Sequence, residues 1–289
     1  MYTIENDKIK IGVNTVGAEL NSIINKSNGL EYLWSGDPAF WAKRSPVLFP
    51  IVGTLKDNTY FYNDKPYQLG RHGFAREMNF VVTEQDLTSL TLTMHDNENT
   101  FKVFPFHFNF SITYTARENS LFVTYSIINK GEETMYFSVG GHPAFKLPLS
   151  AGLKYEDYYL LFNKVETAGR WPISKDGLIE SASSPLLNNE NKLPLAKELF
   201  YKDAIVFKHL QSNEVQLKSD KDTAALSFSF TGFPFLGIWA AKNADFVCIE
   251  PWCGIADSVD AKQDLTAKEG IIGLAAGDVF ERTWSVTIY

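Results

Sequence analysis

Apolar side chains alternate with polar or small ones in many short segments of this 289-residue chain. A period of two is the spacing of a β-strand that buries one face in a core. The alternation recurs from one end of the chain to the other, in segments 9–13, 108–114, 121–127, 135–139, 226–230 and 284–288. Aromatic residues, which pack well on a pleated surface, make up 14% of the chain. The sequence therefore predicts an all-β fold.

The connections between these segments are short. The stretches ARENS (116–120) and NKGEE (129–133) each follow a long alternating segment and predict polar hairpin loops. Long amphipathic helices are missing, and residues 193–200 form at most two helical turns. This combination predicts a single-domain antiparallel β-sandwich of large twisted sheets over residues 1–289, with few short helices. The polar segment 181–192 is expected to be a loop inside that domain.

Composition excludes several classes of function. The net charge of −7, without a long basic run, argues against nucleic-acid binding. No apolar run approaches the roughly 18 residues of a membrane span, and the first residues do not resemble a signal peptide. We therefore expect a soluble, cytoplasmic protein whose partner is a small molecule, neutral or anionic. Cys248 and Cys253 could pair, but two reduced thiols are expected at this spacing.

A carboxylate stands at the end of an apolar run in FVCIEPWCGIADS, residues 246–258. If 246–250 is a strand, Phe246, Cys248 and Glu250 share one face. Partial desolvation there would disfavour the charged form of Glu250 and make it a stronger base. Pro251 lacks a backbone donor, which predicts that the strand ends there or lies at an edge. The alternative is an edge glutamate that reaches water past Trp252.

Two further stretches contain histidines at glycine-rich breaks. In VGGHPAF (139–145), two glycines and Pro143 flank His142, which predicts a break near the sheet rim and close approach of a ligand to the backbone. In LGRHGFAR (69–76), Arg71, His72 and Arg76 surround a glycine, which suits an oxygen-rich ligand. A locally bonded turn histidine and a solvated charged turn are the respective alternatives. His95, His107 and His209 are interpreted as structural.

No motif indicates a cofactor. The chain has no glycine-rich phosphate loop after a strand, no nucleophile elbow and no HExxH pair. His72, His142 and a carboxylate could form a two-histidine metal site, but their spacing does not require one. We therefore expect no cofactor and no metal.

Four stretches in order, residues 45–60, 71–76, 140–145 and 246–257, resemble the aldose 1-epimerase (galactose mutarotase) superfamily, in particular its LacX-like branch. The resemblance covers nearly the whole chain. It implies a mutarotase-like β-sandwich that binds a sugar on an open concave face and interconverts the α and β anomers of an aldose without a cofactor. It also implies that Glu250 is the general base, that His142 is the general acid, and that His72 hydrogen-bonds sugar oxygens. Asp203, by a looser match, would anchor sugar hydroxyls.

The chain also departs from that family pattern. Lys56 stands where the better-known branch has an Asn-Arg pair, and His142 precedes Pro-Ala-Phe instead of a Tyr-Phe pair. Arg76 resembles an arginine of the hexose-6-phosphate epimerases, so Lys56, Arg71 and Arg76 could hold a phosphate. The substrate is therefore a free hexose or a sugar phosphate.

The sequence is also compatible with other functions. The cleft could belong to a non-catalytic carbohydrate-binding protein, to a hydrolase that uses Asp203 and Glu250, or to a metal-dependent isomerase. The acid and base roles of His142 and Glu250 could be exchanged or shared with His72. The protein could be a monomer or a homodimer.

Overall fold

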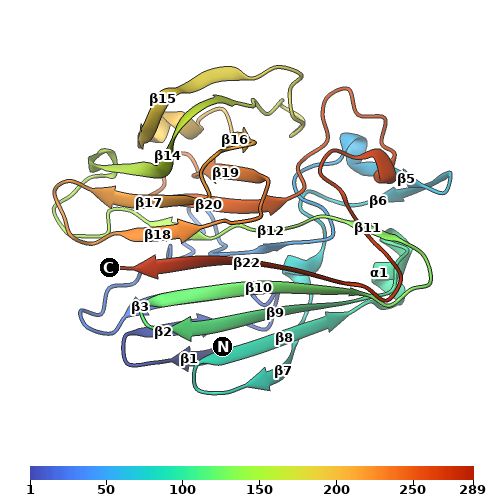
Figure 1. Ribbon diagram of the computed structural model, residues 1–289, viewed down its shortest axis with the longest axis horizontal. Coiled ribbons are helices and arrows are strands. Elements are labelled where there is room, and N and C mark those ends of the chain that lie inside the picture. The colour runs from blue at the N-terminus through green and yellow to red at the C-terminus, as the bar shows by residue number, and fades with distance from the viewer.

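The computed structural model describes residues 1–289, and its strands form two large antiparallel sheets (Figure 1). The predicted all-β antiparallel architecture is confirmed. In order across the larger, nine-stranded sheet lie β15 (Ser184–Pro194), β14 (Tyr158–Arg170), β17 (Glu214–Ser219), β18 (Leu226–Ser229), β22 (Val279–Ile288), β10 (Ser120–Asn129), β9 (Phe108–Arg117), β8 (Ser89–His95) and β7 (Val81–Gln85).

The smaller sheet has six strands and carries most of the residues that matter for function. Its order is β16 (Ile205–Lys208), β19 (Phe235–Trp239), β20 (Phe246–Cys253), β12 (Val139–Gly141) and β4 (Val47–Leu48), while β13 (Ala144–Lys146) also pairs with β20.

Shorter elements complete the fold. Three small sheets consist of β1 (Tyr2–Glu5), β2 (Ile9–Val13) and β3 (Leu20–Asn25); β5 (Thr59–Tyr62) and β6 (Lys65–Gln68); and β11 (Met135–Phe137) and β21 (Ile272–Leu274). Single 3₁₀ turns are η1 (Lys56–Asn58), η2 (Ala75–Glu77), η3 (Tyr155–Asp157), η4 (Lys197–Phe200) and η5 (Leu265–Ala267). The one α-helix, α1 (Glu98–Val103), has six residues, and no helix is long and apolar enough to cross a membrane.

The loop predictions had mixed outcomes. Residues 116–120 do form a hairpin, in which Arg117 of β9 pairs with Ser120 of β10. The prediction of a hairpin at 129–133 is wrong, because β11, the strand that follows β10 in the chain, pairs with β21 and not with β10. The loop predicted at 181–192 is also wrong, because most of it is β15. This strand lies at the sheet edge with most side chains in solvent, so backbone bonds to β14 hold it without an apolar pattern.

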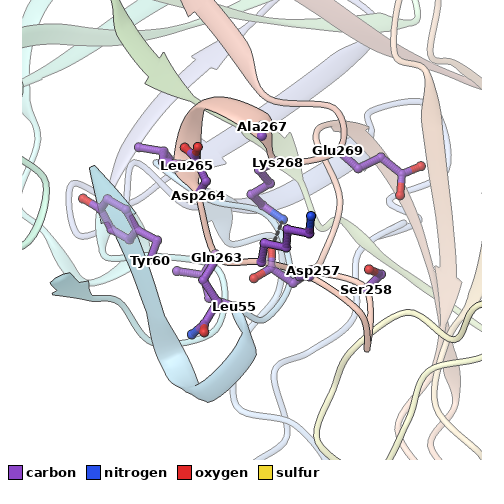
Figure 2. Close-up of a pocket in the computed structure, with 12 residues that line it drawn as sticks. Leu55, Tyr60, Asp257, Ser258, Gln263, Asp264, Leu265, Ala267, Lys268 and Glu269 are labelled. Atoms are coloured by element: carbon purple, nitrogen blue, oxygen red, sulfur yellow. Dashed lines mark hydrogen bonds and ion pairs between the residues drawn. The ribbon is translucent and has the colours of Figure 1, made fainter. Parts of the chain in front are cut away.

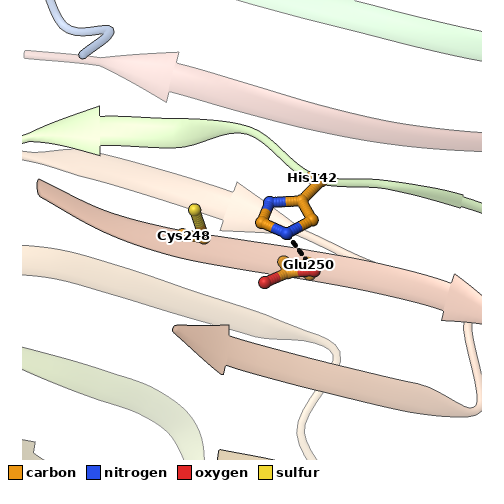
Figure 3. Close-up of side chains that lie close together, drawn as sticks. All are labelled: His142, Cys248 and Glu250. Atoms are coloured by element: carbon orange, nitrogen blue, oxygen red, sulfur yellow. Dashed lines mark ion pairs between the residues drawn. The ribbon is translucent and has the colours of Figure 1, made fainter. Parts of the chain in front are cut away.

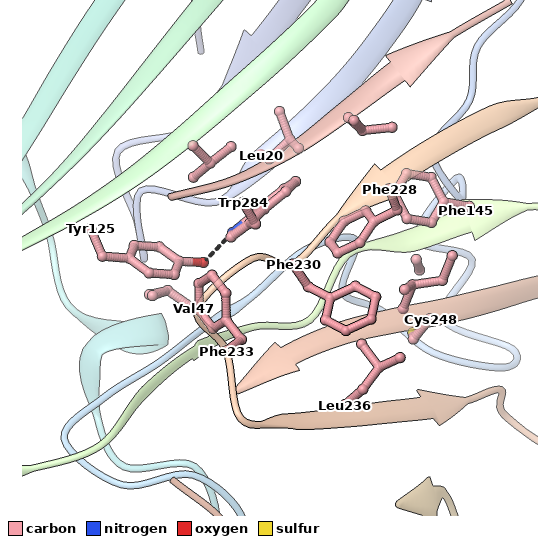
Figure 4. Close-up of a cluster of buried hydrophobic side chains, with 14 of the residues drawn as sticks. Leu20, Val47, Tyr125, Phe145, Phe228, Phe230, Phe233, Leu236, Cys248 and Trp284 are labelled. Atoms are coloured by element: carbon pink, nitrogen blue, oxygen red, sulfur yellow. Dashed lines mark hydrogen bonds between the residues drawn. The ribbon is translucent and has the colours of Figure 1, made fainter. Parts of the chain in front are cut away.

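Alternating residues of both large sheets fill one core. Tyr125 of β10, Phe228 of β18 and Trp284 of β22 point from the nine-stranded sheet toward Phe145 of β13 and Leu236 of β19 (Figure 4). The Trp284 indole donates a hydrogen bond to the Tyr125 hydroxyl at 2.9 Å, so this buried polar pair is satisfied. This packing turns one face of the six-stranded sheet inward and leaves its other face for the site.

Strand register shows which residues share that other face. Trp239 pairs with Cys248, Gly237 with Glu250, and Phe235 with Trp252. Directly opposed residues of neighbouring strands point to the same side of a sheet. The prediction that Cys248 and Glu250 share one face of a strand is therefore confirmed.

Pro251 does not end β20, so the predicted strand end is wrong. The strand continues to Cys253, and Pro251 lies opposite Leu236 of β19 in the sheet interior. Because the Ile249 amide donates to the Pro143 carbonyl, the nitrogen two residues later faces the same neighbour. The backbone nitrogen of Pro251, which has no hydrogen to donate, therefore faces the break between β12 and β13. The backbone hydrogen bonds between these strands and β20 are already interrupted there.

Candidate active site

The register of the six-stranded sheet brings His142 and Glu250 together. Gly140 of β12 pairs with Trp252, and Ala144 of β13 pairs with Cys248, both in one uninterrupted register along β20. His142 lies midway between Gly140 and Ala144 and therefore opposite Glu250. Its Nε2 is 3.3 Å from Glu250 Oε2 (Figure 3). Two residues 108 positions apart in the chain thus become cross-strand neighbours.

The Glu250 carboxyl group is almost completely buried, with 2% of the residue exposed. Burial raises the pKa of Glu250 well above its usual value, and the nearby positive charge of Arg71 offsets part of that increase. Gly237 opposes Glu250 on β19, and a Cβ there would overlap the indole ring of Trp252. A glycine at this position therefore leaves room for the Trp252 ring.

Aromatic rings surround the His142 imidazole. Trp41 packs against it with ring centroids 4.9 Å apart, and Trp239 meets it edge-on at 5.6 Å. Burial lowers the pKa of His142 to about 3, and the positive charge of Arg71 adds to this effect. The two pKa shifts favour a protonated carboxyl group at Glu250 and a neutral imidazole at His142.

The glycines before His142 serve aromatic packing. A Cβ on Gly140 would lie 2.8 Å from Trp252 Cδ1, and one on Gly141 would lie 2.8 Å from the Tyr125 hydroxyl. The prediction that these glycines admit a ligand close to the backbone is therefore wrong. The break itself is present, but within the sheet and not at its rim.

His72 is held in one tautomer by the backbone. It adopts a left-handed conformation (φ 68°), and its Nδ1 accepts a hydrogen bond from the Gly53 amide at 3.1 Å. An accepting Nδ1 places the ring proton on Nε2. Burial lowers the pKa of His72 well below its usual value, so the ring stays neutral with Nε2 as a donor. The His72 ring lies edge-on to that of His142, with centroids 5.8 Å apart.

Charged groups line the open side of the site. Arg71 Nη2 is 3.5 Å from Asp203 Oδ1, and the Arg76 guanidinium donates from Nη2 to the Arg71 carbonyl at 3.0 Å. Asp203 stands just before β16, where its Oδ1 accepts the Ala204 amide at 2.7 Å. These contacts fix both arginines and the carboxylate around one opening.

These side chains enclose a cavity of about 320 Å³, within the usual range for small-molecule sites. Its lining residues are Trp41, Arg71, His72, Arg76, His142, Asp203, Ala204, Trp239, Glu250 and Trp252. Three buried polar atoms of this lining, His142 Nδ1, Arg76 Nε and Trp252 Nε1, make no hydrogen bond to the protein, although Arg76 Nε lies 3.8 Å from Glu77 Oε1. Buried polar groups are nearly always hydrogen-bonded to protein or water. The cavity therefore suits several water molecules or a ligand with several oxygens.

The sequence model of the family described as aldose 1-epimerase matches residues 1–269. The "Protein LacX, chromosomal" of Lactococcus lactis subsp. lactis is 33% identical over 294 aligned positions, which cover 99% of this chain and 98% of the relative. This chain belongs to the aldose 1-epimerase family. The resemblance drawn from the four sequence stretches is confirmed.

Solved structures of galactose mutarotase-like proteins share the whole fold. A galactose mutarotase related enzyme from Lactobacillus acidophilus superimposes with a TM-score of 0.95 at 39% identity, covering 100% of this chain and 97% of its own. A galactose mutarotase-like protein from Lactobacillus casei ATCC 334 gives a TM-score of 0.94 at 31% identity over 100% of both chains. The membership supports a general epimerase or mutarotase role.

Within this aldose 1-epimerase fold, one sequence-predicted residue lies away from the cavity. Lys56 is absent from the cavity lining, and its Nζ donates to the Val259 carbonyl at 2.9 Å. Its backbone amide donates to Asp257 Oδ2 at 2.9 Å. The expected anion-binding role of Lys56 in this cavity is therefore wrong. A lysine in a loop beside a glycine looks like a ligand-binding cation in sequence, but here it secures the loop itself.

A second polar cluster stabilises the loop that contains Lys56 (Figure 2). Lys268 and Asp257 form an ion pair of 2.8 Å with side chains only 3% and 4% exposed. The Asp257 amide also donates to the Thr54 carbonyl at 2.9 Å, next to the Gly53 amide that binds His72. This pair connects the chain after β20 to the segment that orients His72.

The sequence did not predict that tryptophans form the cavity wall. Trp41, Trp239 and Trp252 form much of the cavity wall, and they come from a loop, from β19 and from β20. The six tryptophans of the chain were a signal, because aromatic walls are typical of small-molecule sites. Their spacing gave no indication that three of them meet.

The other three histidines behave differently. His95 Nδ1 lies 2.7 Å from Asn109 Oδ1, and His107 Nδ1 lies 2.7 Å from Asp96 Oδ2. His209 lies near Phe235 and lines a separate pocket. None of them lines the cavity described above, as their structural interpretation predicted.

Proposed function

We propose that this protein interconverts the α and β anomers of a hexose or a related aldose by acid–base ring opening. The observation that carries the proposal is the buried contact of 3.3 Å between His142 Nε2 and Glu250 Oε2 in the wall of a sugar-sized polar cavity. Membership of the aldose 1-epimerase family supports the same reaction class.

The proposed reaction requires one proton to leave the C1 hydroxyl and another to reach the ring oxygen. Burial favours the protonated form of Glu250 and the neutral form of His142, as the directions of both pKa shifts indicate. Transfer of that proton across the contact gives a carboxylate and an imidazolium. Glu250 then accepts the C1 hydroxyl proton, and His142 donates its proton to the ring oxygen as the bond between C1 and the ring oxygen breaks.

Ring closure reverses these transfers. Rotation about the C1–C2 bond presents the other face of the aldehyde, the ring oxygen attacks C1, and its proton returns to His142. Glu250 gives its proton to the new C1 hydroxyl. Protons and electrons balance without a redox partner, so we expect no cofactor requirement and full activity after treatment with EDTA.

Five further residues are proposed to position the sugar. His72 can donate from Nε2 to a sugar oxygen, because its Nδ1 is occupied by the Gly53 amide. Asp203 can accept sugar hydroxyl protons, and Arg71, its partner at 3.5 Å, can donate to the same or a neighbouring oxygen. The flat rings of Trp41 and Trp239 offer apolar walls for the C–H faces of a pyranose.

A sugar phosphate is the second candidate substrate. Arg71 and Arg76 both line the cavity, and guanidinium groups bind phosphate through charge-assisted hydrogen bonds. Asp203 offsets part of this positive charge, because it lies 3.5 Å from Arg71. The free sugar therefore remains the first candidate.

The test is exchange between anomers, measured by NMR for a panel of aldoses and for glucose and galactose 6-phosphates. Acceleration of a free hexose supports the first proposal, whereas selective acceleration of a 6-phosphate supports the second. Melting temperatures are recorded with each sugar. A rise in melting temperature without any acceleration would identify a carbohydrate-binding protein and refute both catalytic proposals.

A further inference from the structure

We propose that His142, Cys248 and Glu250 form a binding site for a thiophilic divalent cation such as Zn²⁺, which inhibits the protein by occupying the acid–base pair. Binding of the cation rests on geometry alone. Its inhibitory effect rests in addition on the function proposed above.

The three side chains converge on one point. Cys248 and Glu250 lie two residues apart on one face of β20, and His142 faces them from the break between β12 and β13 (Figure 3). One imidazole nitrogen, the thiol sulfur and one carboxylate oxygen all lie within 4.8 Å of one another. All three residues are buried, so the sheet fixes their positions.

The distances suit a tetrahedral ion. Zinc bonds of about 2.0–2.3 Å to N, O and S ligands place neighbouring ligand atoms roughly 3.4 Å apart. The separation between His142 Nε2 and Glu250 Oε2 is already 3.3 Å. The ligand atoms lie up to 4.8 Å apart, so a movement of the Cys248 sulfur by about 1–2 Å completes the set.

The donor types suit zinc and disfavour Mg²⁺ or Ca²⁺. Thiolate and imidazole are preferred ligands of zinc, and three protein ligands with one open position are typical of accessible zinc sites. His142 and Glu250 line the cavity, so the fourth position opens toward it and water can fill it. Cys248 does not line the cavity and lies two residues from Glu250 along β20.

Charge balance favours the bound ion in this buried place. Binding releases one proton from the Cys248 thiol and one from the Glu250 carboxyl group, so a divalent cation is neutralised by two anions and no net charge is buried. Zinc must displace both of these protons to bind. Affinity is therefore expected to increase as the pH rises.

The experiment uses the full-length protein after treatment with EDTA. Co²⁺ replaces Zn²⁺ as a spectroscopic probe, because a cobalt–thiolate bond gives a near-ultraviolet charge-transfer band. We expect this band at one equivalent of Co²⁺ and its loss when Zn²⁺ is added. Absence of the band in the folded wild-type protein would overturn the proposal without any variant.

Two cysteine variants then locate the site. Calorimetric titration with Zn²⁺ is expected to show that Cys248→Ala weakens binding by at least about 100-fold, the upper end for loss of an outer-shell partner. Cys253→Ala, which removes the other buried thiol, is the matched control and keeps wild-type affinity. Equal affinity in both variants would also overturn the proposal. Cys248→Ser replaces Cys248→Ala if the alanine variant does not fold.

Anomer exchange with and without Zn²⁺ provides the functional readout. In the wild type and in Cys253→Ala, saturating Zn²⁺ is expected to stop the exchange, and EDTA is expected to restore it. Absence of exchange in the metal-free protein would refute the proposed function and leave the cation site intact. Unimpaired exchange with cobalt or zinc bound would show that the ion does not occupy the acid–base pair.

Discussion

Replacing Glu250 with glutamine tests the acid–base pair most directly. The amide keeps the size of the carboxyl group and can donate a hydrogen bond to His142 Nε2, 3.3 Å away in the native contact. It cannot accept a proton from the sugar. Loss of a positioned acid or base costs about 10²–10⁴-fold in rate, or roughly 3–5 kcal/mol of transition-state stabilisation. We expect Glu250→Gln to slow anomer exchange by that factor.

The same change should not weaken the fold. Burial raises the pKa of Glu250 in the folded protein above its unfolded value, so ionisation favours the unfolded state as pH increases beyond the unfolded pKa. The glutamine variant lacks this cost. Its free energy of unfolding at pH 7 is therefore expected to equal or exceed that of the wild type.

Glu166 offers a matched control, because it is equally buried at 2% exposure but lies away from the cavity. Its carboxylate accepts the Ser212 amide at 2.6 Å and the Gln211 amide at 3.3 Å. Glu166→Gln is expected to lose about 1–3 kcal/mol of stability while it keeps the exchange rate.

NMR exchange and urea unfolding are measured on both variants. The reasoning fails if Glu250→Gln keeps more than about a tenth of the wild-type rate, a loss below the range expected for a general acid or base. It also fails if the activity of Glu250→Gln is lost only because the protein unfolds.

Four further predictions follow from the same geometry. Because burial lowers the pKa of His142 to about 3, the imidazole of His142 should not titrate between pH 7 and pH 5; a midpoint near 6.5 in the NMR titration of that ring would contradict a buried neutral imidazole. Because that pKa is depressed, unfolding draws a proton onto His142 below pH 6.5, and His142 alone should lower stability by about 2 kcal/mol between pH 7 and 5, next to a further loss from His72 and an opposite contribution from Glu250; His142→Asn should remove the His142 part of the loss in urea titrations. Lys268→Met leaves Asp257 buried and unpaired and should cost about 3–5 kcal/mol in urea unfolding, whereas addition of Asp257→Asn should recover much of it; a single variant as stable as the wild type would show that the pair is solvated. Arg76→Gln should raise KM for the preferred sugar or sugar phosphate in exchange kinetics, whereas Lys56→Met should leave KM unchanged. The reverse pattern would show that the substrate does not bind in the cavity lined by Arg76.

The sequence by itself determined the class of fold and the side-chain faces of single strands. A period of two is a local property of the extended backbone, so alternation along β9, β10 and β22 was readable without any contact. The same rule placed Cys248 and Glu250 on one face of β20. The family motifs added the expectation that His142 and Glu250 act together.

Local patterns failed where neighbouring strands override them. Pro251 continues inside β20 because its missing donor faces the break in the adjacent strand. The polar segment 181–192 becomes the edge strand β15 because backbone bonds to β14 need no apolar side chains. Neither effect is visible in the residues concerned.

Only the tertiary structure decided how the site is assembled. Register across β12, β13 and β20 is a long-range property, and it sets the 3.3 Å contact of His142 with Glu250. The same packing assembles the tryptophan walls, turns Lys56 toward Val259, and brings Cys248 next to the pair. Burial then shifts the pKa values, because desolvation depends on every segment that packs around a charge and not on the residue's own neighbours in the chain.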